Sequence, residues 1–179
     1  GIKGAIVVND RMETSVPDIY AAGDAVQVKN SVTGDDALIS LAGPANKQGR
    51  IIADNICGLD SRYKGSQGSS VIKVFDMTAA LTGINERTAK TVGLNADTVI
   101  LSPMSHAGYY PGGKVMTMKV VFEKDTYRLL GAQIVGFDGV DKRIDVLATA
   151  IHAGMKATEL KELDLAYAPP YSSAKDPVN

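Results

Sequence analysis

Short apolar runs recur along this chain. They occupy residues 6–8, 71–75, 79–81 and 99–101, and each is bounded by polar or turn-forming residues. Runs of this length favour strands over helices, which need longer periodic segments. Each run therefore predicts a strand.

Two longer apolar segments predict a β-hairpin. Residues 115–122 and 129–135 flank a short polar stretch that begins at Glu123. Apolar segments joined by a polar turn of this length favour antiparallel pairing. We therefore expect a mainly antiparallel sheet in the C-terminal part of the chain.

A helix is predicted over residues 45–57. Ile51, Ile52 and Ile56 recur at helical spacing and would form its apolar face. Pro44 suits the first helical position, because its missing N–H has no partner at a helix start.

Three more helices are predicted further along. One runs from Asn85, a residue type common at N-caps, to about Gly93. Asp141 would cap a second helix that ends before Gly154, and Thr158 would cap a shorter third one.

Residues 61–70 are polar and rich in Gly and Ser, which is the composition of a surface linker. We place a domain boundary there. Residues 1–60 then form one domain of α/β character, and residues 71–179 form an α+β domain with a mainly antiparallel sheet.

Residues 14–25 (TSVPDIYAAGDA) form the most informative segment. Residues 19–22 predict a buried strand, after which Gly23 lets the backbone approach a ligand. An ionised Asp24 accepts hydrogen bonds from ligand hydroxyl groups. On geometry alone, an ordinary Gly-Asp turn explains the segment equally well.

Composition narrows the possible partners. The chain is 45% hydrophobic and 22% charged with a net charge of -1, so it has no basic excess for nucleic acid. No apolar run approaches the roughly 20 residues that span a bilayer. The single cysteine excludes an internal disulfide and fits a cytoplasmic protein. We expect neither a nucleic-acid nor a membrane partner.

The Asp24 segment resembles the second flavin motif of the FAD-dependent pyridine nucleotide-disulfide oxidoreductases. In that family the matching Asp binds the ribityl chain of FAD. The resemblance implies this role for Asp24, with Gly23 and Ala25 beside it.

The resemblance covers nearly the whole chain, but only the C-terminal part of the family's architecture. It implies that residues 1–60 are an α/β segment of an FAD-binding domain and that residues 71–179 are the α+β dimerisation domain. No Gly-x-Gly-x-x-Gly fingerprint occurs, and the chain begins with Gly1 rather than Met. We therefore expect a fragment of a longer protein.

Residues 41–50 (LAGPANKQGR) match a family segment whose helix N-terminus points at the flavin ring. Free N–H groups and the helix dipole stabilise negative charge, as on a reduced flavin. Ala42 and Gly43 would supply these N–H groups, with Leu41 before them. Taken alone, a helix that simply starts with proline is the better explanation. The position after Asp24, in the family's order, favours the flavin.

Residues 106–113 (HAGYYPGG) resemble a segment of the coenzyme A-disulfide reductase branch. There a tyrosine reaches across the dimer to the partner's active cysteine. The resemblance implies this role for Tyr109, with Tyr110 as the second choice.

Residues 166–177 (AYAPPYSSAKDP) match a tail that lines the thiol site in the same branch. The resemblance implies site roles for Tyr167 and Lys175, with Tyr171 as a weaker candidate. A phenol can donate to a thiolate, and a lysine can pair with it or with a coenzyme A phosphate. The prolines enforce an extended path that suits contact with another subunit. The alternative is a tail packed on its own domain.

The remaining reactive residues predict no further site. His152 is expected to be a packed or surface residue, and Cys57 a structural one. No His and Glu pair of the glutathione reductase type occurs in the tail. Asp35 and Asp36 suit a solvated turn, and no cluster has metal-ligand spacing.

The resemblance implies an FAD-dependent reductase that passes electrons from NAD(P)H through FAD to a cysteine redox centre and coenzyme A disulfide. It would form a homodimer through residues 71–179. A rival within the superfamily is an NADH oxidase or peroxidase, which reduces oxygen or peroxide. A rival of another class is a dimerisation module that has no catalysis of its own as an isolated chain.

Overall fold

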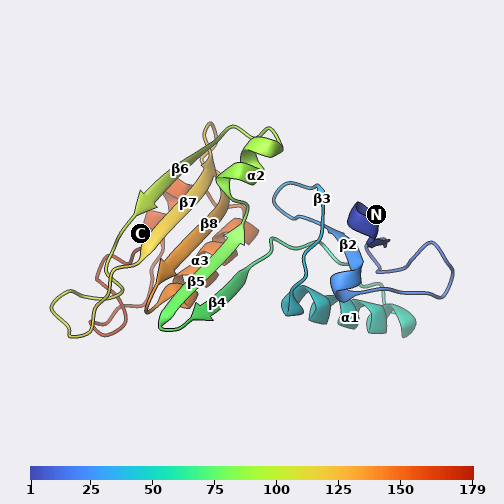
Figure 1. The fold of residues 1–179 in the computed structure, drawn as a ribbon, viewed down its shortest axis with the longest axis horizontal. Helices are drawn as coiled ribbons and strands as arrows, with labels where there is room; N and C mark the ends of the chain where they lie inside the picture. The colour runs from blue at the N-terminus through green and yellow to red at the C-terminus, as the bar shows by residue number, and fades with distance from the viewer. The chain divides into compact units, whose positions relative to one another are not determined.

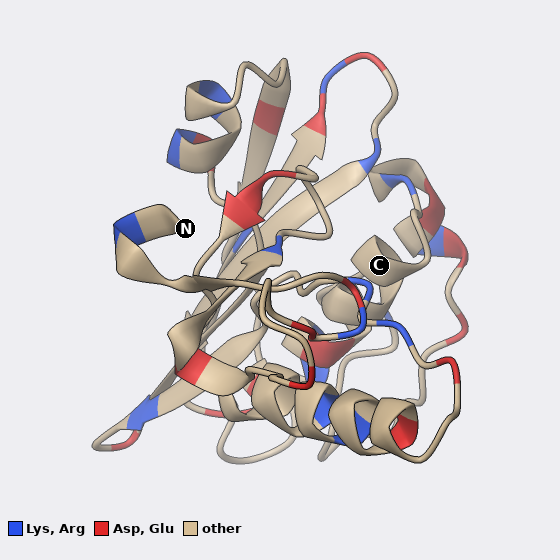
Figure 2. Cartoon of the chain, turned by 90° about the vertical axis from the view of Figure 1, so that its right-hand side faces the viewer, with Lys and Arg blue, Asp and Glu red and all other residues tan.

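The computed structural model describes all 179 residues. They divide into two compact units, Gly1–Gly68 and Ser69–Asn179 (Figure 1). The division falls within the segment 61–70. Acidic and basic residues are interspersed along the helices and loops (Figure 2).

The first unit consists of a small mixed sheet and one long helix. Its sheet has the order β1-β2-β3, with β1 parallel and β3 antiparallel to β2. Met12, Val26, Val28 and Ile51 form its core. The elements are a 3-10 helix η1 (Ile2–Gly4), β1 (Ile6–Val7), a 3-10 turn η2 (Gly23–Ala25), β2 (Val26–Lys29), β3 (Asp36–Ala37) and α1 (Ala42–Ile56).

The strand predicted over residues 19–22 is wrong. This segment forms a single isolated bridge, between Tyr20 and Glu13, and Ile19 is 52% exposed. A strand forms only where several consecutive residues make backbone hydrogen bonds to a neighbouring strand. Within this chain the segment pairs on one side alone, with residues 12–14.

Helix α1 begins three residues earlier than predicted. Pro44 therefore lies at its third position rather than its first. Proline at the third position costs no hydrogen bond, because the first four N–H groups of a helix have no partner within it. Ile51 is buried as predicted, but Ile56 is 64% exposed and does not belong to the core. Cys57, predicted to be structural, is also exposed.

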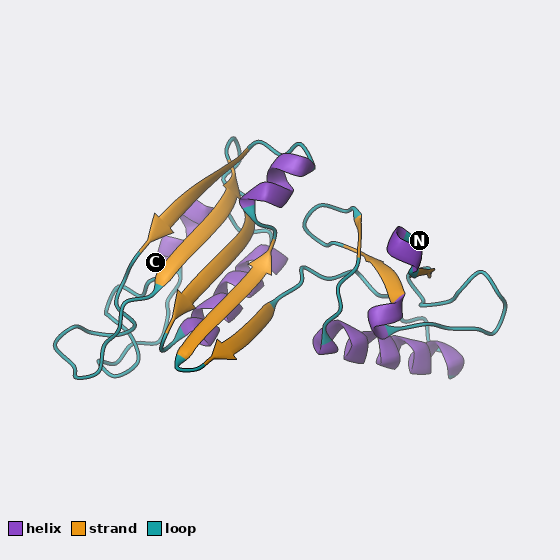
Figure 3. Ribbon diagram, viewed as in Figure 1, coloured by secondary structure: helices purple, strands orange, loops and turns teal.

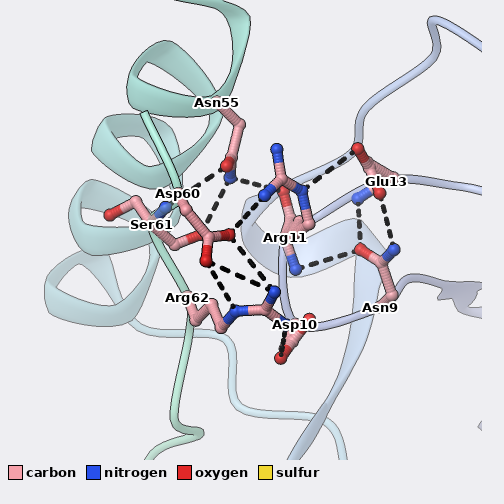
Figure 4. Close-up of polar contacts among 8 residues, drawn as sticks. All are labelled: Asn9, Asp10, Arg11, Glu13, Asn55, Asp60, Ser61 and Arg62. Carbon is pink, nitrogen blue, oxygen red and sulfur yellow. Dashed lines mark hydrogen bonds and ion pairs between the residues drawn. The ribbon is translucent and has the colours of Figure 1, made fainter. Parts of the chain in front are cut away.

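A polar network joins residues 9–13 to residues 60–62 (Figure 4). The Asn55 amide is buried at its centre and donates to the carbonyls of Arg11 and Ser61 at 3.2 and 2.9 Å. Around it, Arg62 pairs with Asp10 at 2.9 Å. Exposed ion pairs are worth about 0–1 kcal/mol each, so the buried amide is the stronger tie.

The second unit is built on a five-stranded antiparallel sheet with the order β4-β5-β8-β7-β6 (Figure 3). The predicted hairpin is confirmed, because β7 and β8 pair directly. The elements are β4 (Ser70–Val74), β5 (Met77–Gly83), α2 (Glu86–Thr91), β6 (Ala96–Leu101), β7 (Thr117–Glu123), β8 (Leu129–Gly136), α3 (Val140–His152) and the 3-10 helix η3 (Ala157–Glu162).

Local capping follows prediction at α2 and differs at α3. The Asn85 side chain accepts from the Thr88 N–H and caps α2, as predicted. At α3 the cap position is Gly139, whose φ of 67° is left-handed, and Asp141 lies inside the first turn. Glycine adopts this backbone conformation without steric cost, so the helix starts one residue before Asp141.

One face of the sheet packs against α3. Ile144 and Leu147 of the helix belong to a single buried cluster with Ala80, Met118 and Ile134 of the strands. Alternate residues of the strands point to the opposite face of the sheet, which α3 does not cover.

The C-terminal tail packs on its own unit. Ser172, Asp176 and Val178 are buried, and Val178 joins the core beneath α3. Contact of the tail with another subunit stays a prediction, and the end of the tail packs on its own domain, which is the stated alternative. The reason is an ion pair that sequence pattern does not reveal: Arg143 of α3 is 1% exposed and binds Asp176 at 3.0 Å.

Asp176 is ionised at neutral pH despite its burial. Burial alone would raise the pKa of this carboxyl. Hydrogen bonds from Arg143, Ser172 and the Val178 N–H, together with the Arg143 charge, outweigh burial and hold the pKa below its usual value. The paired carboxylate therefore contributes stability at neutral pH.

Replacing Asp176 with Asn should destabilise the second unit by about 3–5 kcal/mol, because the buried Arg143 charge loses its partner. Urea unfolding measures the change. Asp145→Asn, an exposed carboxylate on α3, is the matched control and should stay within about 0.5 kcal/mol.

The same pair sets a pH dependence. Because the folded pKa of Asp176 lies below the unfolded value of about 3.9, its contribution is complete above that value and is lost as pH falls through the folded pKa. The difference between the wild type and Asp176→Asn should thus narrow in acid. A constant difference from neutral pH to strong acid would contradict this assignment.

Candidate functional site

The Asp24 turn presents an unpaired carboxylate. Gly23, with φ of 75°, opens the 3-10 turn η2, and both Asp24 and Ala25 are exposed. Asp24 has no hydrogen bond or ion pair within the chain. Only glycine adopts this φ readily, so Gly23 fixes the direction in which the carboxylate is offered.

The N-terminus of α1 presents unpaired backbone donors. Leu41 is the cap residue and supplies no side-chain hydrogen bond, while Ala42 and Gly43 are exposed. A Cβ at Gly43 would meet no atom within 4 Å. The first N–H groups and the positive end of the helix dipole are therefore open to an anionic group.

A buried glutamine fixes these two features beside each other. The Gly23 N–H donates to Gln48 Oε1 at 2.7 Å, and Gln48 of α1 is only 1% exposed. A Cβ on Gly23 would lie 3.8 Å from Ala45 Cβ. The structure thus places the turn Gly23–Ala25 against helix α1, whose first residues are Ala42 and Gly43 and whose cap is Leu41. Their donors and carboxylate fit a ligand that has both hydroxyl groups and a negatively charged edge.

A cavity of about 500 Å³ in the first unit does not coincide with this site. Val7, Met12 and Tyr63 are among its lining residues, and none of the predicted ligand-binding residues contributes to it. The chemistry-bearing groups therefore lie on the surface around η2 and the start of α1.

Two predicted tyrosines meet in the second unit. The hydroxyl groups of Tyr109 and Tyr167 lie 2.8 Å apart and share a hydrogen bond, although 58 positions separate the residues. Both are exposed, Tyr109 by 76% and Tyr167 by 46%. The hydrogen bond with Tyr109, with a further contribution from desolvation, raises the pKa of the Tyr167 phenol. A phenol is protonated at neutral pH in any case, so each hydroxyl of the pair carries a hydrogen that it can donate.

The other predicted residues of this region do not share the hydrogen bond of the pair. Tyr110 stacks edge-on against the buried His106, with ring centroids 5.6 Å apart. Tyr171 and Lys175 are exposed, and neither side chain makes a hydrogen bond to the paired tyrosines. The structure therefore selects Tyr109 and Tyr167 as a unit and does not place Lys175 in it.

The sequence reasoning missed the residues that organise both places. Gln48 and Asp176 carry no local signal, because each bonds a partner distant in sequence. Arg143 carries one: it lies four and seven residues before Leu147 and Ala150, on the buried stripe of α3. A charged residue on an apolar stripe indicates a buried ion pair.

The histidines and acidic residues form no further site. His152 is exposed, as expected of a surface residue, and Asp36 pairs with Lys29 at 2.7 Å. No group of three or more His, Cys, Asp or Glu residues is placed to hold a metal ion. None of the helices combines the length and the apolar character needed to cross a membrane.

Several known proteins are similar to this chain in both sequence and fold. Coenzyme A disulfide reductase from Staphylococcus epidermidis is 40% identical over 178 residues, which are 99% of this chain and 40% of that protein. The crystal structure of reduced CoADR-RHD from Bacillus anthracis matches with a TM-score of 0.96 and 53% identity, covering 100% of this chain and 32% of the other. The water-forming NADH oxidase from Lactobacillus brevis matches with a TM-score of 0.94 and 31% identity, covering 100% and 40%.

The chain thus spans less than half the length of each of these relatives. Residues 69–177 match the model of the pyridine nucleotide-disulphide oxidoreductase dimerisation domain, which is nearly the whole of the second unit. This match covers more than half of the chain and shows that the chain belongs to the pyridine nucleotide-disulphide oxidoreductase family.

Proposed function

We propose that this chain is the C-terminal part of an FAD-dependent reductase that passes electrons from NAD(P)H through FAD to a cysteine redox centre and coenzyme A disulfide. The hydrogen-bonded pair of Tyr109 and Tyr167 carries the proposal. Two exposed phenols from distant segments have no packing reason to meet, whereas a thiol site needs such donors. The 40% sequence identity between this chain and a coenzyme A disulfide reductase supports the same substrate.

In the first unit, Gly23, Asp24 and Ala25 would hold the ribityl hydroxyls of FAD. The N–H groups of Ala42 and Gly43 would stabilise negative charge on the flavin ring. FAD, when bound, supplies the hydride and electron transfer that side chains cannot perform. The residues of this chain bind and orient it, and the rest of the FAD site would come from a part of the protein outside this chain.

In the second unit, the tyrosine pair would serve the thiol site of the partner subunit. A protonated phenol donates a hydrogen bond to a thiolate, and a charge-assisted bond of this kind stabilises the thiolate as it forms. Phenols are protonated at neutral pH, so either hydroxyl of the pair can act as the donor. Lys175 is exposed and free to pair with a coenzyme A phosphate.

The uncovered face of the five-stranded sheet is the proposed homodimer surface. Strand alternation places Ile72, Leu81, Ile100 and Val135 on the face opposite α3, and each is at least 40% exposed. Apolar side chains gathered on one face mark a protein interface. The match of this unit to a dimerisation domain supports a second copy of the chain as the occupant.

A second candidate function is an NADH oxidase or peroxidase. The structural match to the water-forming NADH oxidase, at 31% identity, favours it. Such an enzyme reduces oxygen or peroxide and does not need a coenzyme A site. The tyrosine pair favours the disulfide reductase, because a phenol pair beside a thiol suits disulfide exchange.

The first test concerns substrate and the tyrosine pair. The full-length enzyme should reduce coenzyme A disulfide faster than peroxide or oxygen when all three are assayed in parallel with NADH and NADPH. Tyr109→Phe and Tyr167→Phe should each lower that turnover about 10- to 100-fold, the value of a hydrogen bond to a charged group.

Tyr127→Phe is the matched control, because Tyr127 is an exposed tyrosine stacked on Phe122 in the turn between β7 and β8. It should leave turnover unchanged. Fast turnover of peroxide or oxygen alone would instead establish the oxidase.

The second test concerns FAD. Asp24→Asn in the full-length protein should weaken FAD binding about 10- to 100-fold, because a charged acceptor of ligand hydroxyls is lost. Flavin absorbance after dialysis measures the retained cofactor. Asp18→Asn, an exposed carboxylate of the same unit, should retain FAD fully. Equal FAD content in both variants would remove Asp24 from the site.

The third test concerns the dimer. Ile72→Asp should raise the dissociation constant of the dimer at least about 100-fold, because an unpaired carboxylate buried at an interface costs several kcal/mol. Lys73→Asp, on the other face of the same exposed strand, is the control and should leave the dimer intact. Light scattering across a concentration series measures both. A wild-type chain that remains monomeric at high concentration would contradict the proposal.

A further inference from the structure

The two segments that carry the tyrosine pair converge on one buried guanidinium. Arg143 Nη2 donates to the carbonyl of Ser105 at 2.9 Å and to the carbonyl of Tyr171 at 3.4 Å. Ser105 lies four residues before Tyr109, and Tyr171 lies four residues after Tyr167. A single side chain thus bonds the backbone of both segments close to the tyrosines.

We infer that Arg143 is a positioning residue that holds the Tyr109 and Tyr167 hydroxyls within hydrogen-bonding distance. The inference rests on the proposed function only in assigning the pair to a thiol site. Arg143 lies in the core of its unit beneath the two segments and acts through Tyr109 and Tyr167 rather than on the substrate.

Every nitrogen of the guanidinium donates a hydrogen bond, so its place is determined. Its Nε and Nη2 bind both oxygens of Asp176, at 3.3 and 3.0 Å, and its Nη1 donates to the Gly139 carbonyl at 3.1 Å. The Ser172 hydroxyl donates to Asp176 at 2.6 Å and also lies 3.3 Å from Arg143 Nη2. Asp176 therefore anchors the tail to the helix, and Arg143 anchors the loop to both.

One direct backbone bond completes the junction. The Ala107 N–H donates to the Ser172 carbonyl at 3.0 Å, which joins the loop before Tyr109 to the tail after Tyr167. On the other flank, Lys142 Nζ lies 3.4 Å from the Ala166 carbonyl, next to Tyr167. Each segment is thus held on the α3 side.

The tyrosine pair does not organise these segments by itself. Both rings are exposed, and a hydroxyl-to-hydroxyl bond in water contributes only about 1 kcal/mol, comparable to the entropy cost of fixing one residue. A buried, bidentate ion pair is geometrically stricter, because the planar fork of arginine fits carboxylate and carbonyl oxygens at fixed angles. Lysine keeps the charge but lacks the fork.

Arg143→Lys in the 179-residue chain tests the inference. Ring-labelled tyrosine NMR follows each phenol through its titration, and Tyr167→Phe identifies the Tyr167 signal. In Arg143→Lys the pKa of Tyr167 should fall back toward that of an ordinary phenol, because Tyr109 no longer stays in contact. Arg128→Lys, the same change at a half-exposed arginine that pairs with Glu123 at 3.8 Å, should leave the titration unchanged.

Activity gives a second, independent readout in the full-length enzyme. Arg143→Lys should lower turnover about as much as Tyr109→Phe, and the double variant should be no slower than Tyr109→Phe alone, because both changes break one interaction. A purely structural role for Arg143 would instead give effects that multiply.

The outcomes decide the inference. A folded Arg143→Lys chain with an unchanged Tyr167 titration overturns it, as do multiplicative effects on turnover. If Arg143→Lys does not fold, Ser172→Ala decides: it removes the hydroxyl that bonds both Asp176 and Arg143, which loosens the placement of the guanidinium, and it should move the pKa of Tyr167 in the same direction. No movement overturns the inference. A shifted titration together with no coenzyme A disulfide turnover in the wild type refutes the proposed function and leaves the positioning role standing.

Discussion

The buried ion pair between Arg143 and Asp176 is the constraint on which the second unit depends. A guanidinium that is 1% exposed must be paired, since an unpaired charge in a protein interior costs several kcal/mol. The only carboxylate that satisfies it comes from the last residues of the chain. The tail is consequently drawn back over α3, and the loop that carries Tyr109 is held between the two. The fold places its exposed tyrosines by means of a charge that no solvent reaches.

In the first unit, a buried hydrogen bond leaves neighbouring polar groups without partners. Its buried polar residue, Gln48, is satisfied by the Gly23 N–H, and this bond leaves the neighbouring Asp24 carboxylate and the first N–H groups of α1 without partners. Unpaired groups on a rigid backbone lower the cost of binding a ligand, because they need no rearrangement. Satisfied polar groups fix geometry in both units, and in the first unit they leave unpaired groups at the proposed FAD site.

Features that depend on neighbours in sequence were predictable. The hairpin of β7 and β8 and the Asn85 cap follow from local pattern, and the structure contains both. Features that depend on distant partners were not. Residues 19–22 are as apolar as a buried strand, yet pairing decides whether a strand exists, and here a single bridge to Glu13 is all that forms.

The site divides in the same way. Asp24 and the start of α1 were identified because a motif carries them, and the structure adds only the contact with Gln48 that joins them. The tyrosines were identified by resemblance, but nothing local distinguishes Tyr167 from Tyr171 as the partner of Tyr109. The path of the tail decides which tyrosine meets Tyr109. That path is set by the ion pair between Arg143 and Asp176, which lie 33 positions apart in the sequence.

The bond between Tyr109 and Tyr167 also has a consequence for proton supply. Each hydroxyl carries one hydrogen, and one of the two is spent within the pair whichever tyrosine donates. The pair therefore offers a single outward hydrogen at any moment. Rotation about the two C–O bonds exchanges the roles of the two hydroxyls, so the outward donor changes ring while each hydrogen stays on its own oxygen. The surface thus offers one outward hydrogen-bond donor, which either tyrosine can supply, rather than two independent phenol donors.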